Sequence, residues 1–302
     1  MGIFSAMSRY FPLISLMLLL ALAACAPDAT STPEAAVSAE ATLPDPEVAT
    51  PTAGVAAANV GGEEISRATF ELHLVLYQAA QAQIGTLLAT EEAQQAVINN
   101  LVERLLLAQG AREQGFSAES VLEERLANLV QQAGGQEAFD AWLAANGYSS
   151  EVFRAELALE IEAAHMRDLI AAQVPTTAEQ VHARQILLSD QFSADRLLGQ
   201  LNEGTPFEQI VANNDPARFG DLGWFPRGYL LQAEVEEAAF ALQAGEHSQV
   251  VQSELGFHLI EVIERNPARL LNPQALLQLQ TQAIADWLEQ RRTQTEVSIF
   301  LP

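Results

Sequence analysis

Apolar residues recur at helical spacing through residues 60–175. The clearest helix is predicted at residues 91–115, where one broad apolar face is formed by Val97, Ile98, Leu101, Val102, Leu105 and Leu106. The same periodicity predicts further helices at residues 69–84, 117–129, 136–146 and 150–172. Because this stretch shows five helical patterns and no strand pattern, we expect an all-α domain.

A hinge is predicted at residues 174–179. Pro175 disfavours continuation of the preceding helix, and Thr176 and Glu179 have the spacing of a capping box, which is typical of a helix start. We therefore expect a domain boundary here.

From residue 181 the pattern alternates between short strands and short helices. The predicted order is a strand at 181–188, helices at 194–201 and 206–212, a glycine-rich turn at 219–228, a helix at 235–240 and a strand at 256–262. This mixture indicates a second, α+β domain.

The last part of the chain is predicted to contain one more helix. Asn266-Pro267 is expected to break the chain, and residues 273–292 have an apolar face made by Leu277, Ile284, Trp287 and Leu288. A single helix cannot bury such a face alone. We expect it to pack on the N-terminal helices, which would make the α+β domain an insertion.

The N-terminus carries the pattern of a secretion signal. Arg9 precedes an apolar run at residues 11–24, which is too short to span a bilayer as a helix. Leu22-Ala-Ala24 before Cys25 resembles a bacterial lipobox, which implies a signal peptide at 1–24 and a lipid anchor on Cys25. An ordinary signal peptide with a chance cysteine is the alternative.

Residues 26–59 consist almost entirely of Ala, Ser, Thr, Pro and acidic residues. Such a composition has too little apolar surface to offset the entropy lost on ordering. We therefore predict a disordered tether over residues 25–59, the lipidated cysteine included.

The net charge limits the classes of partner. The 15 basic residues, all Arg, stand against 39 acidic ones, for a formal charge of -24. Nucleic acid is therefore not expected as a partner, because its binding requires a basic surface. The five histidines form no ligand-spaced pair, so no metal site is predicted.

Four motifs in residues 181–265 carry a family resemblance. They are Ala183-Arg-Gln-Ile-Leu187, Gly220-Asp-Leu-Gly-Trp-Phe225, Val235-Glu-Glu-Ala-Ala-Phe240 with its Gly245-Glu246 turn, and Gly256-Phe-His-Leu-Ile260. Together and in this order they resemble the parvulin family of peptidyl-prolyl isomerases. The resemblance implies a small antiparallel sheet flanked by helices and an isomerase that needs no cofactor.

The resemblance also implies the residues of a site. The proline pocket would be formed by Leu222, Leu230 (or Leu231), Val235 and Phe240, although these are also candidates for core residues, Phe240 in particular. The polar residues of the catalytic site would be Asp215, Gln185, His258 and Ser253.

This sequence departs from the family pattern at three positions, two of them among these site residues. Gln185 stands where the family has its first histidine, and His182 would face the opposite side of the strand. Val235 replaces the usual aromatic residue, and Phe219 replaces a glycine of the turn. The loop at residues 189–193 has no basic cluster, which argues against recognition of a phosphorylated substrate.

The helical region resembles SurA- and PrsA-like foldases, through Asn100-Leu-Val-Glu-Arg-Leu-Leu-Leu107 and Ala111-Arg-Glu-Gln-Gly115. A purely structural helical domain is the alternative. The combined interpretation is an α+β protein with a helical chaperone domain at 60–175, a parvulin domain at 176–265 and a C-terminal helix within 266–302 that packs on the chaperone domain.

The function implied is isomerisation of Xaa-Pro bonds in unfolded or proline-containing secreted polypeptides, outside the cytoplasm and at a membrane to which Cys25 anchors the protein. The alternative, from a different class, is a chaperone that binds polypeptide through a catalytically weak or inactive parvulin domain. Gln185 is the feature that separates the two hypotheses. The oligomeric state does not follow from the sequence.

Overall fold

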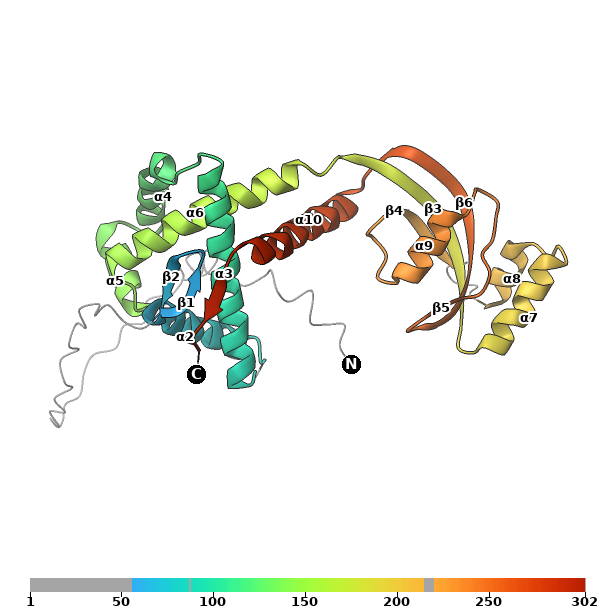
Figure 1. The fold of residues 1–302 in the computed structure, drawn as a ribbon, viewed down its shortest axis with the longest axis horizontal. Coiled ribbons are helices and arrows are strands. Elements are labelled where there is room, and N and C mark those ends of the chain that lie inside the picture. Colours follow the sequence, from blue (N-terminus) through green and yellow to red (C-terminus); the bar gives the residue numbers. More distant parts are fainter. Residues whose placement is uncertain (1–55, 87, 215–219, 302) are drawn as a thin grey trace, which may run out of the picture. The chain divides into compact units, whose positions relative to one another are not determined.

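The computed structural model describes residues 56–86, 88–214 and 220–301. The chain divides into two compact units (Figure 1). The first unit comprises Met1–Arg167 and Leu288–Pro302, and the second comprises Asp168–Trp287. The second unit is therefore inserted in the sequence of the first. Within the described ranges, no helix has both the length and the apolar character needed to cross a bilayer.

The first unit is mainly helical. Its elements are β1 (Ala56–Val60), β2 (Glu63–Ser66), α2 (Arg67–Gln83), α3 (Thr90–Glu113), α4 (Glu119–Gln132), α5 (Gln136–Ala145), most of α6 (Ser150–Ala172), the end of α10 (Pro273–Gln294) and β7 (Val297–Ile299). The five helices predicted for residues 60–175 are confirmed.

Local sequence signals account for the start and end of these helices. Ser66 caps α2, because its hydroxyl oxygen accepts a hydrogen bond from the backbone N–H of Thr69 at 3.0 Å. Gly115 follows α3 with φ +83°, a conformation that glycine adopts without strain. The predicted apolar face of α3 is buried, with Ile98, Val102 and Leu106 fully enclosed.

A small sheet in the first unit corrects the all-α prediction. The strand order is β2-β1-β7, and every pair is antiparallel. Residues 56–59, assigned from composition to the tether, form most of β1, and Ala57 and Ala58 are fully buried. Small side chains gave this strand no visible pattern in the sequence, and its partner β7 lies at the other end of the chain.

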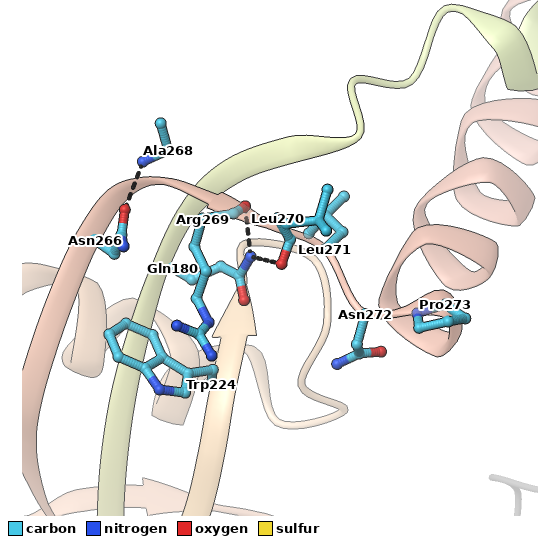
Figure 2. Close-up of a pocket in the computed structure, with 9 residues that line it drawn as sticks. All are labelled: Gln180, Trp224, Asn266, Ala268, Arg269, Leu270, Leu271, Asn272 and Pro273. Carbon is cyan, nitrogen blue, oxygen red and sulfur yellow. Dashed lines mark hydrogen bonds between the residues drawn. The ribbon is translucent and has the colours of Figure 1, made fainter.

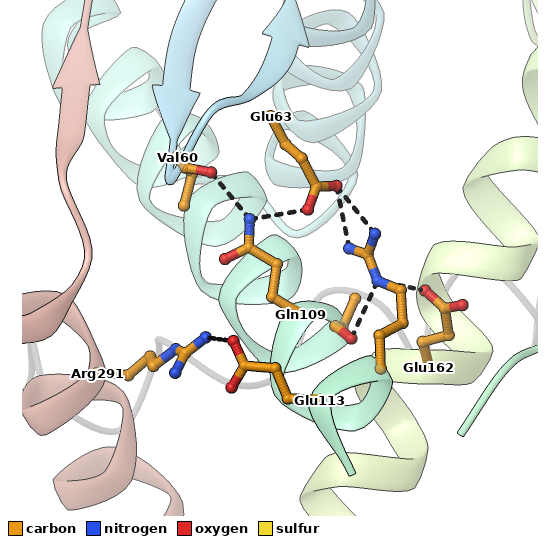
Figure 3. Close-up of polar contacts among 8 residues, drawn as sticks. Val60, Glu63, Gln109, Glu113, Glu162 and Arg291 are labelled. Carbon is orange, nitrogen blue, oxygen red and sulfur yellow. Dashed lines mark hydrogen bonds and ion pairs between the residues drawn. The ribbon is translucent and has the colours of Figure 1, made fainter. Parts of the chain in front are cut away.

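The C-terminal helix packs back on the N-terminal helices, as predicted. Leu288 of α10 is buried, Arg291 forms an ion pair with Glu113 of α3, and Arg292 donates to the backbone oxygen of Asn99 at 3.5 Å. Figure 3 shows Arg291 beside Glu113. Long-range ion pairs and β7 thus join the two ends of the chain.

The second unit is built on one antiparallel sheet of order β4-β3-β6-β5. Its elements are β3 (Thr177–Leu188), α7 (Gln191–Asn202), α8 (Phe207–Asn214), β4 (Asp221–Pro226), α9 (Ala233–Ala241), β5 (Val251–Ser253), β6 (Gly256–Leu270) and the first part of α10.

Two hydrophobic clusters cover the two faces of this sheet. Val181, Ile260 and Val262 pack with α9 residues on one face. Ile186 and Leu259 pack with α7 and α8 on the other. Neighbouring residues of a strand point to opposite faces, so Leu259 and Ile260 belong to different clusters. The predicted α+β parvulin architecture is confirmed.

The capping-box spacing of Thr176 and Glu179, on which the predicted hinge partly rests, begins no helix, because β3 starts at Thr177 and pairs with β6. One local prediction in this unit is wrong. Asn266-Pro267 does not end the last strand, which continues to Leu270. The register shifts between Ala178 and Gln180, and this irregularity accommodates a proline that has no N–H to donate.

Candidate functional site

The sheet places three of the predicted polar site residues on one face. Gln185 is on β3, Ser253 ends β5, and His258 is on β6. Gln185 lies opposite Ile260, two residues from His258, so the two side chains are diagonal neighbours on the α9 face. The short turn from β5 to β6 pairs Ser253 with Gly256 and brings the serine close to His258.

These three side chains form a hydrogen-bonded chain. His258 Nδ1 lies 2.9 Å from Gln185 Oε1, and its Nε2 lies 2.7 Å from Ser253 Oγ. An amide oxygen only accepts, so Nδ1 carries the imidazole proton and Nε2 accepts from the serine hydroxyl. Ser253 Oγ in turn accepts from the N–H of Leu255 at 3.1 Å. One arrangement of protons is consistent with all three of these hydrogen bonds.

The His258 imidazole in this hydrogen-bonded network is held neutral. His258 is only 1% exposed. Burial lowers its pKa from the ordinary value of 6.5, and the nearby Glu234 charge acts in the opposite direction without cancelling the effect. The site therefore presents a neutral, oriented polar network at neutral pH.

Gly220 fixes the backbone beside Gln185. The N–H of Gln185 donates to the carbonyl oxygen of Gly220 at 2.8 Å. Gly220 has φ +63°, and a Cβ atom at this position would lie 1.9 Å from the carbonyl oxygen of Gln185. Only glycine permits such close contact between the turn and the strand.

His182 belongs to a different environment. Its Nε2 lies 2.8 Å from Asp221 Oδ1, and its ring is stacked near Trp224 with 5.6 Å between centroids. The prediction that His182 does not take the place of the missing family histidine agrees with this geometry.

The predicted proline-pocket residues converge at the α9 cluster. Val235 and Phe240 are 2% and 4% exposed, while Leu222 and Leu230 are only partly buried. The Phe240 ring meets Phe225 edge-on at 6.1 Å. Phe240 thus has the environment of a core residue, and Leu222 and Leu230 are the members that keep exposed surface. Leu231 is 82% exposed.

Two predicted residues lie outside the described part of the chain. They are Asp215, expected at the catalytic site, and Cys25, expected to be lipidated. Phe219 and the predicted signal peptide also lie outside it.

The sequence interpretation missed two residues that bind the loop before α9. Glu236 accepts hydrogen bonds from the N–H groups of Gly228, Tyr229 and Leu230. Gln278 donates to the carbonyl oxygens of Gly228 and Tyr229. An acidic residue in the first turn of a helix after a glycine was a local signal for Glu236. Gln278 gave no such signal, because its partners are about fifty residues away in sequence.

A separate hollow of about 600 Å³ lies elsewhere in the second unit (Figure 2). The guanidinium of Arg269 stands 4.3 Å from the centre of the Trp224 ring, and Gln180 Nε2 donates to the carbonyl oxygens of Arg269 and Leu270. None of the residues of the polar network is among those that line this hollow.

Comparison with known families matches both parts of the chain. Residues 46–167 match the SurA-like N-terminal domain, and residues 170–264 match the PPIC-type PPIase domain. The chain thus combines a SurA-like N-terminal domain with a PPIC-type (parvulin) PPIase domain. Its relatives include foldases named PrsA and chaperones named SurA.

Individual relatives differ in how much they share. The foldase protein PrsA of Geobacillus sp. (strain WCH70) is 24% identical over 233 residues, which is 72% of this chain and 79% of that protein. Chaperone SurA of Nitrosospira multiformis is 40% identical over 105 residues, which is 30% of this chain but only 24% of that chaperone. A crystal structure of PrsA from Bacillus cereus aligns with TM-score 0.46 and 19% identity, over 76% of this chain and 85% of that one.

Proposed function

We propose that this protein catalyses Xaa-Pro isomerisation through Gln185, His258 and Ser253, together with Asp215. Leu222, Leu230, Val235 and Phe240 would form the apolar surroundings of the proline ring. The observation that carries the proposal is the hydrogen-bonded network around His258, in which Gln185 and Ser253 contact the two ring nitrogens. The sequence resemblance is what places Gln185 at the family's histidine position.

The chemistry needs neither a nucleophile nor a metal. Rotation about the peptide bond is slow because its partial double bond must be broken, and catalysis requires a site that binds the twisted amide better than the planar one. A buried, neutral and oriented network is suited to this, since preorganised polar groups need not reorient during the reaction. The Gln185 amide offers both a donor and an acceptor group, as a neutral histidine does with its two ring nitrogens.

The test is prolyl cis–trans exchange, measured by NMR on short peptides with one Leu-Pro bond. We expect the full-length protein to accelerate exchange, Asp215→Ala to be slower, and Gln185→His to be faster than wild type. His182→Gln is the matched control, because His182 lies away from the network. If Gln185→His leaves the exchange rate unchanged, the missing imidazole is not what limits the site.

A chaperone that binds peptide without catalysis is the second candidate. The burial of Val235 and Phe240 favours it, because it leaves only the partly exposed leucines to contact a proline ring. Peptide chemical-shift changes without faster exchange in the same experiment would identify this function.

We further propose a cellular setting. The SurA-like helices would bind unfolded or proline-containing secreted polypeptides, and a lipid on Cys25 would anchor the protein outside the cytoplasmic membrane. The names foldase and chaperone of the relatives support the first point, and the sequence of residues 1–25 supports the second. Metabolic labelling with palmitate tests the anchor: wild type should be labelled and Cys25→Ser should not.

The division into functional segments is part of the proposal. We place a signal peptide at 1–24, a tether up to the first strand, chaperone helices up to 175, the isomerase domain at 176–265 and the C-terminal helix after it. Limited proteolysis with mass spectrometry checks this division. The first cuts are expected in the tether, and early cleavage within α3 would contradict it.

A further inference from the structure

The loop Gly228–Leu230, which leads from β4 towards α9, has its backbone bound by two side chains. The Glu236 carboxylate accepts from the N–H groups of Gly228, Tyr229 and Leu230 at 2.7, 2.9 and 3.0 Å. Gln278 Nε2, from α10, donates to the carbonyl oxygens of Gly228 and Tyr229 at 3.0 and 2.9 Å. A carboxylate on one side and an amide on the other thus hold three consecutive residues.

This loop carries one wall of the proposed proline pocket. Leu230 is partly buried and packs, with Tyr229, against the cluster that contains Val235 and Phe240. Just before the loop, the guanidinium of Arg227 stands 4.2 Å from the centre of the Phe240 ring. Gly228 has φ +79°, so the chain turns sharply at the residue that both side chains bind. The position of Leu230 therefore depends on how the loop backbone is held.

Gln278 lies outside the matched isomerase domain, which ends at residue 264. It belongs to the first turns of α10, where Leu279 also approaches the loop: a Cβ on Gly228 would lie 3.4 Å from Leu279 Cδ2. The residues that bind the pocket loop are therefore not all contained in that domain.

We propose that Glu236 and Gln278 are positioning residues, which hold the Gly228–Leu230 loop so that Leu230 can contact the proline ring of a client polypeptide. The C-terminal helix is then a working part of the isomerase site. The catalytic consequence of this inference rests on the proposed function. The hold of Glu236 and Gln278 on the loop backbone, called the clamp below, can be tested separately.

Matched variants of the full-length protein test it. Glu236→Gln keeps the shape of the side chain but turns an NH2 donor towards backbone N–H groups, and Glu237→Gln makes the same change at an exposed position of α9. Gln278→Ala removes the donor from α10. Gln282→Ala is its control, because Gln282 is exposed and bonds to Asp286 of its own helix.

Three quantities are measured for each variant: amide hydrogen exchange at Tyr229 and Leu230, the Kd for a short Leu-Pro peptide, and kcat and KM for its isomerisation. We expect Glu236→Gln and Gln278→Ala to speed amide exchange in the loop and to raise Kd and KM by roughly tenfold, because a misplaced pocket wall weakens substrate contact. The kcat per folded molecule should change much less. The two controls should match wild type.

The outcomes separate the inference from the proposed function. Loop amides as well protected in Glu236→Gln as in wild type would overturn the clamp, whether or not the protein is an isomerase. A fall in kcat at constant KM and Kd would overturn the positioning role and leave a purely structural one. A wild type that binds peptide without catalysing exchange would contradict the proposed catalysis, while the loop amides and Kd would still decide the clamp.

Discussion

Two polar networks, one in each unit, are built in opposite ways. In the second unit, Gln185, His258 and Ser253 form a neutral chain across three strands. In the first unit, Arg104 of α3 pairs with Glu156 of α6, and His73 of α2 lies 3.2 Å from the same carboxylate. One network is neutral, and the other joins an arginine, a carboxylate and a histidine from three helices.

The two networks differ in what it costs to bury them and in what is lost when one partner is removed. A neutral hydrogen-bonded network costs little to bury once its hydrogen bonds are complete. A buried ion pair costs more to desolvate but becomes indispensable once formed, because removing one partner leaves the other charge uncompensated. Burial alone would raise the pKa of Glu156, but the His73 hydrogen bond and the Arg104 charge outweigh it and hold the pKa below 4.5.

The largest effect is expected from Glu156→Gln. The Arg104 side chain is 5% exposed, so loss of its partner should reduce the free energy of unfolding of the first unit by about 3 kcal/mol. Urea unfolding measures this. The matched control is Glu123→Gln, since Glu123 is 70% exposed and pairs with Arg154 on the surface. Equal losses in both variants would show that burial does not decide the strength of the pair.

A smaller loss of stability is expected from Ser253→Ala, which breaks the neutral hydrogen-bonded network around His258. This change removes the donor to His258 Nε2 and the acceptor for the N–H of Leu255, which should reduce stability by about 1–2 kcal/mol. Urea unfolding, with prolyl exchange in parallel, measures both consequences. Gln252→Ala is the control, because Gln252 is exposed on the adjacent position of β5. A stability change no larger than that of the control would show that the Ser253 hydrogen bonds do not stabilise the second unit.

The pH response should also differ between the units. The folded pKa of His258 lies below 6.5, so the unfolded chain binds more protons between the two values. The contribution of His258 to stability is therefore complete above pH 6.5 and is lost as pH falls towards the folded pKa. The corresponding loss for Glu156 begins only below 4.5. NMR titration of the His258 imidazole checks this, and a folded pKa at or above 6.5 would contradict it.

Local pattern was sufficient for much of the fold. The helical periodicity of α3, the Ser66 cap and the strand motifs around Gln185 and His258 are all determined by nearby residues, and each is found in the structure. The family motifs also anticipated that Gln185 and His258 meet, because the register of two adjacent strands fixes that contact.

The features that were missed depend on residues far apart in the sequence. β1 pairs with its neighbour β2 on one side, but its other partner, β7, lies over two hundred residues later. Thr176 and Glu179 have the spacing of a helix start, but pairing with β6 overrides that local preference. The contact of Gln278 with Gly228 has the same character. Periodicity and spacing describe neighbours along the chain, so they cannot show such partners.

The smallest effect is expected from Glu63→Gln, in the polar cluster of the first unit where Glu63 also accepts from Gln109 (Figure 3). Both η nitrogens of Arg112 donate to Glu63 at 3.0 Å, but Arg112 and Glu63 are 38% and 43% exposed. Solvent screens such a pair, and Arg112 keeps Glu162 at 3.3 Å, so the loss should be less than about 1 kcal/mol and should shrink with added salt. Urea unfolding at low and high salt measures it. Glu63→Gln and Glu156→Gln make the same chemical change beside an arginine, so the ratio of their effects compares an exposed pair that keeps a second carboxylate with a buried pair that does not. A loss at Glu63 as large as that at Glu156, and insensitive to salt, would mean that geometry rather than solvent exclusion sets the strength of both pairs.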